Sequence, residues 1–570
     1  MSILGNRVLR KEDRKFLTVG GSYVYDLDLP GAASVFYVRS TVAHGRITGM
    51  DVSGARKAPG VLDVVTAAEV DLAPMPPEIP VINQAMPRPF LADGVVRFVG
   101  EPVVAVVAET PEQAVDAAEA VWVDYEALPV VVDPEAALAG DTLLFPEAGD
   151  NVALDLSGPA DGSMFEGCEV VVRQRVVNQR LAPCPLEVRA GAARWEDGGR
   201  LTFWTSTQAP HGVKDNLVKL LGLEPEMVHV VAPDVGGGFG AKGSPYADEL
   251  FLAFLARRAG RPVRWVETRS ESMVALGHGR AQVQDVEIGG TRDGRVLAYR
   301  LNVVQDSGAY PAIGAILPTL TKAMLTGVYD IPRAGFSARA VVTNTTPTVA
   351  YRGAGRPEAT AAIERAMDCF AAEIGMDPAE VRRANLVGPD AFPYVTPTGT
   401  TYDSGDYGGA LDRVLGAAGY EELRAEQARR RAAGERRQLG IGLSVYVEIT
   451  NGVPGSEFGA VEVHPDGSVT VRTGTSPHGQ GHATAWAMLV SDALGIPVED
   501  IEVVHGDTDV VPRGIGTFGS RSLQTGGVAA RQAAVEVVDR GRRLAAELLE
   551  ADPADVVLDP DGGRFHVAGT

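Results

Sequence analysis

The feature that most restricts the fold of this chain is a run of glycines placed directly after an apolar segment. Met227–Val235 (MVHVVAPDV) predicts a strand, and it leads into Gly236–Lys242 (GGGFGAK). Glycine tolerates positive φ and lets backbone N–H groups approach an anion or a cofactor closely. A predicted helix at Ala247–Ala259 and a strand at Arg261–Glu267 follow, so the glycine loop lies among alternating strands and helices.

Two familiar functions of glycine loops have to be weighed for this segment. A P-loop needs glycine before its lysine and serine or threonine after it, but Ala241 and Gly243 occupy those positions, which excludes it. A dinucleotide-binding fingerprint matches formally through Gly238, Gly240 and Gly243, with a strand that ends in Glu267 downstream. Such a pattern arises by chance in glycine-rich chains. A tight turn is therefore the stronger interpretation, and a nicotinamide dehydrogenase stays open as an alternative.

Composition narrows the class of protein. The net charge of −22 argues against a nucleic-acid partner, because such proteins more often carry a basic face. No run of about 18 apolar residues is present, so no membrane span is expected. The three cysteines, Cys168, Cys184 and Cys369, form no CxxC pair and are fewer than the roughly four thiolates of an iron–sulfur cluster. The N-terminus has no apolar core of a signal peptide, so a cytoplasmic location is expected.

The order of predicted elements indicates an α+β chain of several domains. Val95–Ala108 is apolar and β-branched, which predicts one buried strand, and Thr110 caps a helix expected to run to about residue 126. A stretch rich in Ala, Gly, Asp and Pro around residues 135–160 predicts a domain boundary. We therefore expect an N-terminal α/β domain at residues 1–140, followed by domains at 155–395 and 420–570.

Hairpins recur in the two later domains. Val283–Val304, Val461–Arg472 and Val556–Val567 each alternate around a turn with Asp and Gly. Residues 421–438 are strongly charged and predict a solvated connecting helix between the domains, whereas His482–Leu494 predicts a helix of the last one.

Four further loops gather groups that suit an anion or a cofactor. His478–His482 (HGQGH) precedes a predicted helix, and backbone N–H groups at a helix start suit a phosphate or pterin better than zinc. Residues 506–522 combine hydroxyls, an arginine and flexible backbone, and Ala350–Arg356 places two arginines in a glycine loop. Gln208 follows the predicted strand Leu201–Trp204. Each loop taken alone also has a plain structural interpretation.

In this order, the five segments resemble the large subunit of the molybdenum hydroxylases, the family of xanthine dehydrogenase, aldehyde oxidase and the carbon monoxide dehydrogenase type. The likeness covers nearly the whole chain, from Phe98–Ala108 (FVGEPVVAVVA) onward. It implies an α+β fold, in which an N-terminal α/β hammerhead-type domain precedes two molybdopterin-binding domains, the last one truncated.

The resemblance assigns roles to the residues that match the family's motifs. Gln208 would hydrogen-bond the apical oxygen on molybdenum, and Arg352 would lie beside the ligands of the metal, with Gly353 and Ala354 at the substrate pocket. No side chain would bind the metal directly. The residues expected to line the metal and its dithiolene are Gly237, Gly238, Phe239 and Gly240. Those expected to hold the pterin are Gly479 and Gln480, and those for the pyrophosphate are Thr517, Gly519, Ser520 and Ser522.

The implied cofactor is molybdenum–molybdopterin, which bacterial three-subunit members usually carry as the cytosine dinucleotide. A small subunit with 2Fe-2S clusters and a medium FAD subunit would carry electrons away, in agreement with the shortage of cysteine here. The implied reaction hydroxylates an aldehyde or an N-heterocycle with water as the oxygen source.

Three departures from the family pattern bear on activity. Carbon monoxide oxidisers place a copper-bridging cysteine where this chain has Gly353, so no copper and no CO oxidation are expected. Purine hydroxylases place a glutamate where this chain has Gly243. The general base of the family, a glutamate in a Gly-x-Gly-Glu loop, is expected beyond Thr570, on a missing C-terminal segment or on a partner chain that carries it. The alternative is a truncated, catalytically inactive remnant that only holds the cofactor.

Overall fold

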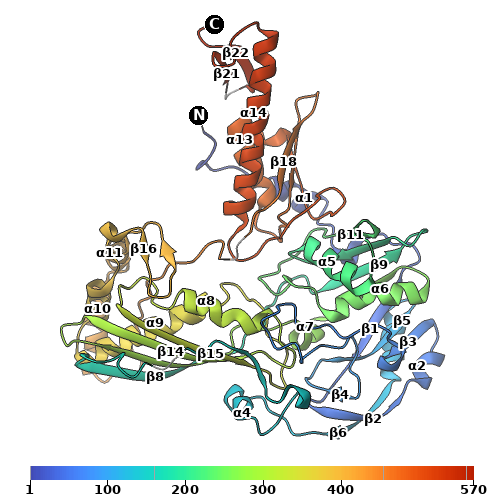
Figure 1. Cartoon of the computed structure of the whole chain (residues 1–570), viewed down its shortest axis with the longest axis horizontal. Coiled ribbons are helices and arrows are strands. Elements are labelled where there is room, and N and C mark those ends of the chain that lie inside the picture. Colours follow the sequence, from blue (N-terminus) through green and yellow to red (C-terminus); the bar gives the residue numbers. More distant parts are fainter. Residues whose placement is uncertain (1, 159–160, 453–454, 560–561) are drawn as a thin grey trace.

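The computed structural model describes residues 2–158, 161–452, 455–559 and 562–570. Three bodies meet near its centre (Figure 1). A mixed sheet with its helices forms the first body, and an arched five-stranded sheet forms the second. A tower with two long helices rises from the junction between them, with the C-terminus at its tip.

The first body is built on a seven-stranded sheet. Its strands are β1 (Ala33–Arg39), β3 (Val61–Thr66), β5 (Pro102–Ala108), β9 (Ala190–Trp195), β10 (Leu201–Thr205), β11 (Val228–Val231) and β12 (Val263–Val266). They lie in the order β11-β10-β9-β12-β1-β5-β3. Because β1 pairs with β12 in parallel, the three N-terminal strands extend the sheet that β9 to β12 form. Helix α5 (Pro210–Leu221) packs beside β11. Helix α6 (Ala247–Ala259) is buried along most of its surface, as its apolar sequence requires.

The N-terminal part also contains a three-stranded sheet and two helices. The strands are β2 (Gly45–Asp51), β4 (Val95–Val96) and β6 (Trp122–Ala127), and the helices are α2 (Ser53–Lys57) and α3 (Pro111–Glu119). The prediction of one strand over Val95–Ala108 is wrong, because the chain turns at Gly100 (φ +103°) and continues as β5 in the other sheet. Thr110 caps α3 as predicted. The helix ends at Glu119 and not near residue 126, because the β-branched and aromatic residues that follow pair with β2.

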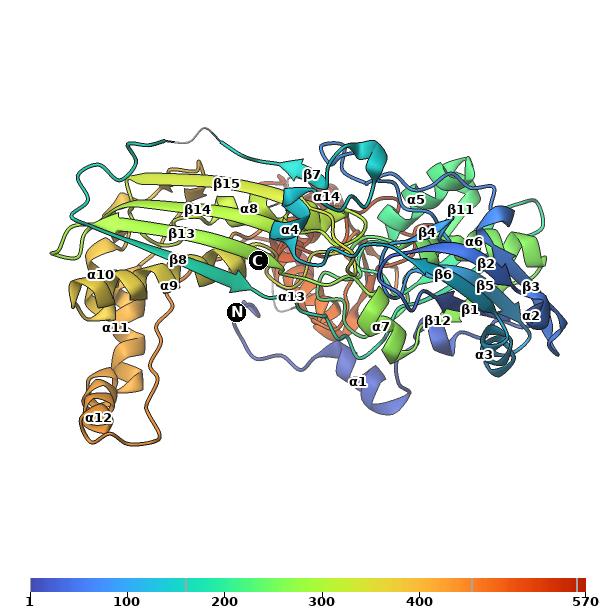
Figure 2. The same ribbon diagram turned by 90° about the horizontal axis from the view of Figure 1, so that it is seen from below.

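The second body is an arched sheet covered by α9 (Arg356–Ile374), with α8 (Leu317–Ala323) and α10 (Pro378–Asn385) beside it. Its strands are β7 (Val152–Asp155), β8 (Val170–Asn178), β13 (Gln282–Gly290), β14 (Val296–Asp306) and β15 (Arg333–Val341), in the order β7-β15-β14-β13-β8. The predicted hairpin around Arg292–Gly294 is confirmed as β13–β14. Figure 2 shows the arch from below, with α9 along β8.

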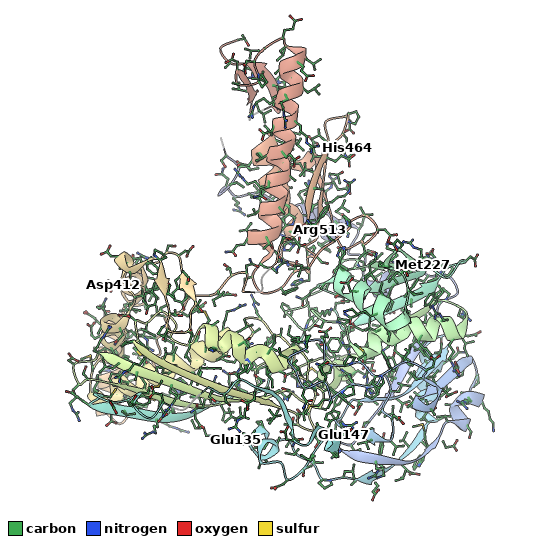
Figure 3. The ribbon with its side chains drawn as sticks, viewed as in Figure 1. Glu135, Glu147, Met227, Asp412, His464 and Arg513 are labelled. Carbon is green, nitrogen blue, oxygen red and sulfur yellow. The ribbon has the colours of Figure 1, made fainter. Side chains whose placement is uncertain are left out.

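The charged connection between the later domains is helical. Helix α12 (Tyr420–Ala432) covers most of the segment predicted as a helix, and it follows α11 (Tyr407–Ala418) and the short pair β16 (Tyr394–Val395) and β17 (Thr401–Tyr402). Figure 2 shows α12 projecting away from the arch, and Asp412 marks α11 in Figure 3. No helix in the described part of the chain combines the length and apolar character that a bilayer crossing requires.

The tower packs two helices on a three-stranded sheet. The sheet consists of β18 (Gly459–Val463), β19 (Val469–Thr473) and β20 (Ile501–Val504), and the helices are α13 (His482–Leu494) and α14 (Val528–Leu548). The predicted hairpin is confirmed, with His464 at its turn and Arg513 near the tower base (Figure 3). The last hairpin is β21 (Val556–Asp559) and β22 (Arg564–Val567), although residues 560–561 of its predicted turn lie outside the described residues. The N-terminal helix α1 (Lys11–Thr18) packs against α13.

Candidate functional site

Gln208 connects the first body to the tower. It follows β10, and its side chain is buried. The Nε2 atom donates to the carbonyl of Thr517 at 2.8 Å, and Oε1 accepts from the backbone N–H of Gly240 at 2.9 Å. The backbone agrees, since Thr517 N donates to Gln208 O at 3.0 Å. One amide therefore ties the glycine loop to a loop of the second predicted cofactor domain.

The glycine loop needs its glycines for close packing. A Cβ on Gly238 would lie 2.4 Å from Gln208 Oε1, and a Cβ on Gly240 would lie 2.7 Å from the carbonyl oxygen of Ala350. Gly237, Phe239 and Gly240 all have positive φ, and the Phe239 ring is 38% exposed. A non-glycine residue held in this conformation is uncommon and tends to mark functional loops.

A partly buried carboxylate, that of Glu187, fixes the base of this loop. Glu187 Oε2 accepts from Gly236 N at 2.7 Å, from Ser206 Oγ at 2.6 Å and from Lys242 Nζ at 3.0 Å. Burial lowers the pKa of Lys242, and the nearby Glu187 opposes that effect. Lys242, the lysine of the glycine loop, is thus engaged in contacts within the protein. No local sequence pattern pointed to Glu187.

The Arg352 loop lies directly against the glycine loop. Arg352 N donates to the carbonyl of Phe239 at 2.8 Å, and the Arg352 side chain is exposed. Gly353 and Ala354 follow with φ of +93° and +40°. The structure therefore brings together the predicted residues around Gln208, Phe239 and Arg352.

Loops of the tower complete the arrangement. Ser476 N donates to Thr517 Oγ1 at 3.0 Å, and the Ser522 hydroxyl lies 3.3 Å from the same oxygen. Ser520 has φ +54°, and its Oγ donates to Glu448 at 2.6 Å instead of pointing to Thr517. Arg521, which was not assigned a role, is buried beside them. Its Nη1 donates to Glu457, whereas its Nε and Nη2 have no partner within the described residues.

Gly479 and Gln480 are exposed at the start of α13, with buried polar atoms close behind them. Gln480 Oε1 accepts from His478 N at 2.7 Å. The Nδ1 atoms of His478 and His482 and the hydroxyl of Ser476 find no partner within the described ranges. Burial lowers the pKa of His478 to about 4 and that of His482 to about 3, so both rings are neutral at pH 7.

A segment that sequence reasoning missed supports this loop from the N-terminus. Arg10 Nη2 donates to the carbonyl of Gly479 at 3.2 Å, and Glu12 accepts from Thr484 N at 3.2 Å and from the Thr484 hydroxyl. Glu12 thereby caps α13, whose own N-cap is Gly481 without a side chain. Lys15 pairs with Asp234 beside the glycine loop, so residues 10–15, which we call the N-terminal arm, connect the two halves of the site. The polar N-terminus carried no motif that could have revealed this role.

The structure decides between the alternatives for these motifs. Glu267, the ribose ligand of a dinucleotide site, is buried and accepts from Arg189 N at 3.0 Å and from its guanidinium at 2.8 Å. It is not available to a nicotinamide ribose. No group of three or more His, Cys, Asp or Glu side chains that could hold a metal occurs in the described part of the chain.

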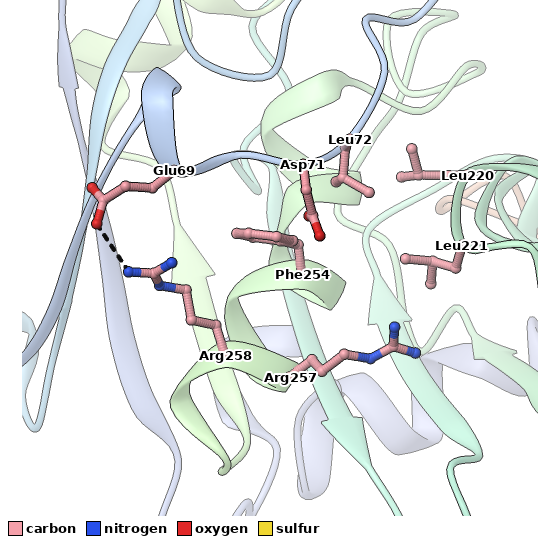
Figure 4. Close-up of a pocket in the computed structure, with 8 residues that line it drawn as sticks. All are labelled: Glu69, Asp71, Leu72, Leu220, Leu221, Phe254, Arg257 and Arg258. Carbon is pink, nitrogen blue, oxygen red and sulfur yellow. Dashed lines mark hydrogen bonds and ion pairs between the residues drawn. The ribbon is translucent and has the colours of Figure 1, made fainter.

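A cavity of about 460 Å³ lies elsewhere, between α6 and the end of α5 (Figure 4). Phe254 and Leu221 are among its lining residues, and Arg258 pairs there with Glu69 at 3.0 Å. None of the residues predicted for the cofactor lines it, so we assign this cavity no part in the site.

The predicted loops fit an oxygen-rich ligand such as a pterin phosphate. Within the described ranges, Arg521 Nε and Nη2 and the Ser476 hydroxyl are buried and have no hydrogen-bond partner. Ser476 contacts Thr517 through its backbone N–H, and Arg521 is four residues further along the same loop. Unpaired buried polar groups are costly, and a ligand with acceptor oxygens would satisfy them. The exposed Phe239 and Arg352 belong to the loops that contact Gln208 and its partners.

Family models match most of the chain. The hammerhead domain of aldehyde oxidase and xanthine dehydrogenase matches residues 18–129, and molybdopterin cofactor-binding domains match residues 144–386 and 413–570. The gamma subunit of the 6-hydroxypseudooxynicotine dehydrogenase complex from Paenarthrobacter nicotinovorans is 38% identical over 100% of this chain and 72% of its own length. The carbon monoxide dehydrogenase large chain from Afipia carboxidovorans is 37% identical over 99% of this chain and 74% of its own.

Solved structures agree in fold. Quinoline 2-oxidoreductase from Pseudomonas putida 86 matches with a TM-score of 0.91 and 35% identity, over 99% of this chain and 74% of that one. Reconstituted CO dehydrogenase from Oligotropha carboxidovorans matches with a TM-score of 0.92 and 36% identity, with the same shares covered. The predicted α+β fold, a hammerhead domain before two molybdopterin-binding domains, is confirmed. The chain belongs to the xanthine oxidase family of molybdenum hydroxylases as a large, molybdopterin-binding subunit, and it is part of an oxidoreductase.

Proposed function

We propose that this subunit hydroxylates an aldehyde or an N-heterocycle, with water as the oxygen source, in a complex with electron-carrying partners. The observation that carries the proposal is the junction at Gln208. Its amide connects Gly240 of the first cofactor domain to Thr517 of the second, and Arg352 joins through Phe239. Motifs far apart in the sequence therefore form one continuous site.

In this proposal the chain's own residues hold and orient the cofactor. The amide of Gln208 has a second N–H beyond the one given to Thr517, and this N–H would help to hold the molybdenum cofactor by donating to one of its oxygen atoms. Gly237 to Gly240 would line the metal and its dithiolene, and Arg352 would lie beside the ligands of the metal. The pterin would lie on Gly479 and Gln480, and the pyrophosphate would lie against Thr517, Gly519, Ser520 and Ser522. When bound, the cofactor supplies oxygen transfer and accepts two electrons.

We propose the cytosine dinucleotide form of the cofactor, with 2Fe-2S clusters on a small subunit and FAD on a medium subunit. The names of the relatives support separate partner chains, since they are a complex subunit gamma and a large chain. All three cysteines are free, and the chain has too few of them for a cluster of its own. Unpaired cysteines also suit the cytoplasm, which is the proposed location. We place the domains at residues 1–140, 155–395 and 420–570.

The proposed reaction is not a copper-dependent oxidation of carbon monoxide. The position that would carry the bridging cysteine is Gly353, with φ +93°, and a Cβ there would lie 2.5 Å from Pro357 Cγ. This loop conformation therefore disfavours any side chain at that position. The relatives include CO dehydrogenase large chains, so the distinction rests on this residue and its surroundings.

Among substrates we favour an N-heterocycle other than a purine over a purine or a simple aldehyde. Gly243 replaces the glutamate that purine hydroxylases would have, and a Cβ at this position would lie only 3.0 Å from the carbonyl of Gly240. Relatives named for N-heterocycles include a nicotine 6-hydroxylase large subunit at 36% identity and the quinoline oxidoreductase.

The proposed general base is a glutamate outside residues 1–570. The named relatives extend beyond the part that this chain matches, which covers 72% and 74% of their lengths. We propose that such a segment, on this polypeptide or on a companion chain, contains the carboxylate that acts as general base when the substrate carbon is attacked.

The test is to isolate the native complex and measure molybdenum, pterin and the mass of every chain, followed by turnover of N-heterocycles and aldehydes with an artificial electron acceptor. Molybdenum with turnover of an N-heterocycle supports the proposal. Molybdenum without turnover of any such substrate, in a complex that includes a Gly-x-Gly-Glu loop, contradicts the reaction. Absence of both molybdenum and pterin would favour the inactive remnant.

A further inference from the structure

The loop that carries Arg352 has a backbone that needs outside support. Gly353, Ala354 and Gly355 have φ of +93°, +40° and +85°. Ala354 carries a Cβ, and a non-glycine residue in this region of backbone conformation is strained. Such a conformation persists only where its surroundings impose it.

Arg280 holds the loop from one side. Its Nη1 donates to the carbonyl of Tyr351 at 2.7 Å, and its Nη2 donates to the carbonyl of Arg352 at 2.5 Å. The guanidinium also lies over the Tyr351 ring, 4.8 Å from its centroid. A planar guanidinium can serve two successive carbonyls at once, which a lysine ammonium cannot do with the same geometry.

Glu358 faces Arg280 from the other side of the loop. It is the third residue of α9, its side chain is fully buried, and its Oε1 lies 3.6 Å from Arg280 Nη1. Burial raises the pKa of Glu358, whereas the charge of nearby Arg280 acts to lower it. Neither carboxylate oxygen makes a hydrogen bond within the described residues. Glu358 therefore lies between the exit of the loop at Gly355 and the arginine that holds its entry.

A buried ion pair of this kind needs a reason other than stability. Replacing such a pair with apolar side chains is often neutral or stabilising, because desolvation offsets most of the attraction. Charged pairs are better suited to fixing a single geometry. Here the geometry fixed is that of the two peptide groups on either side of the Arg352 Cα, which set the direction of its exposed side chain.

We propose that Arg280 and Glu358 are positioning residues that orient Arg352 in the cofactor site. This inference rests on the proposed function, in which Arg352 lies beside the ligands of molybdenum. Neither residue is among those assigned to hold the cofactor. Glu358 restrains the Arg280 guanidinium, and Arg280 holds the Arg352 loop in its strained conformation.

The decisive variant is Glu358→Gln, made in the native complex. Glutamine keeps the side-chain length and is accepted at the third position of a capped helix, so it removes mainly the charge that faces Arg280. We expect kcat to fall between about 10- and 100-fold, with KM changed by about twofold or less. Molybdenum content should be unchanged, and the electron paramagnetic resonance spectrum of the partly reduced complex should shift. Arg280→Lys should give the same losses, and the double variant should be no worse than either single one.

The matched control is Glu364→Gln, two turns further along α9. Glu364 is also buried and paired, with Arg382 at 3.0 Å and with the Tyr329 hydroxyl at 2.5 Å, but it contacts no residue of the Arg352 loop. This variant should lower Tm and leave kcat and the spectrum per molybdenum unchanged. Wild-type kcat and spectrum in Glu358→Gln would overturn the inference, as would a loss of kcat that only follows lost molybdenum. A wild-type complex without molybdenum would instead overturn the proposed function, and the inference with it.

Discussion

The glycine loop of the first predicted cofactor domain and the Gly479 loop of the second have opposite character. In the first domain the glycine loop is packed so closely that a Cβ on Gly238 or Gly240 would collide with Gln208 or Ala350. In the second domain a Cβ on Gly479 would meet nothing within 4 Å. Buried polar atoms that find no partner among the described residues lie beside the loops of the second domain, as Ser476 and Arg521 show. The first half is therefore formed in advance, whereas the second leaves polar groups for a ligand to satisfy.

The supports of the two halves also differ. The glycine loop is held from within its own body, by Glu187 and Lys242. The loop at Gly479 is held by the N-terminal arm, through Arg10 and Glu12. The geometry of the second half therefore depends on a segment more than 460 residues away in sequence, since Arg10 and Gly479 are 469 positions apart.

The largest effect is expected at the rigid half. Gly238→Ala should lower kcat by about 100-fold or more, because its Cβ must displace the Gln208 amide, and misplacement by about 1 Å can cost 100-fold. Steady-state turnover of the isolated complex measures it. The control is Gly416→Ala on α11, where a Cβ meets nothing within 4 Å and alanine favours the helix. Equal turnover of the two variants would show that the glycine loop is not preformed.

Removing the connecting amide should have a somewhat smaller effect. Gln208→Ala loses the hydrogen bonds to Gly240 and Thr517 without adding a clash. Turnover should fall between about 10- and 100-fold with the fold intact, as for other residues that orient reacting groups. Circular dichroism together with kcat tests both parts. Unchanged turnover in an assembled complex would contradict the proposed place of Gln208 at the metal.

Sequence patterns predicted the rigid half better than its supports. Strand and helix periodicity gave α6 at Ala247–Ala259 and α13 at His482–Leu494 with their observed bounds. Gln208 and Arg352 were assigned to the site through the family resemblance of their loops, and their roles at the cofactor stay predictions. Glu187, Glu358 and the N-terminal arm act through contacts between distant segments. Single residues such as Glu12 in a polar helix look like ordinary surface residues until the fold is known.

The prediction from the hydrophobic pattern was wrong where a turn carries the chain from one sheet to another. Val95–Ala108 is mostly apolar, and residues 97–101, which include Gly100 with φ +103°, separate β4 from β5. A Cβ on Gly100 would lie 2.8 Å from the carbonyl of Val274, so the break depends on a contact that no local pattern records. The helix expected to continue past Glu119 ends because Trp122 begins a strand that pairs with β2.

The stability of the two halves should change with pH in opposite directions. Burial lowers the pKa of His478, His482 and His505 to about 4, 3 and 4. These histidines stabilise the fold above pH 6.5, and that contribution is lost as the pH falls toward 4, by about 1.4 kcal/mol per pH unit for each histidine. Glu249 in α6 behaves in the opposite way. Burial raises its pKa to about 8, so its contribution is fully present below pH 4.5 and is lost as the pH rises through 8.

Hydrogen exchange by segment measures this contrast. Between pH 6 and 4, protection should fall first around α13 and β20, which carry or flank the histidines. Between pH 5 and 8, as the pH rises, protection should fall first around α6. Simultaneous loss in both regions at each pH would mean that the two bodies unfold as one unit.

Weakening the contacts of the N-terminal arm should have a smaller effect than the changes in the glycine loop. Glu12→Gln weakens the cap on α13, and losing a cap costs about 1 kcal/mol. Cofactor retention on dilution should fall about fivefold, because that energy enters the binding equilibrium. Molybdenum content after gel filtration measures it. Asp28→Asn, at an exposed position, is the control for the change of charge. Equal retention of the cofactor in the two variants would show that the N-terminal arm plays no part in cofactor binding.

The smallest effect is expected for the exposed ion pair between the first body and the tower. Arg200 Nη2 and Asp509 Oδ2 lie 2.6 Å apart, with both side chains about one-third exposed. Solvent screening limits such pairs to roughly 0 to 1 kcal/mol, so Arg200→Gln should shift Tm only slightly and leave kcat unchanged. Thermal unfolding at low and high salt measures it, because high salt should abolish even that small difference. A loss of stability well above 1 kcal/mol would mean that surface ion pairs hold the tower to the first body. It would weaken the conclusion that Gln208, Thr517 and the buried loops hold the two halves together.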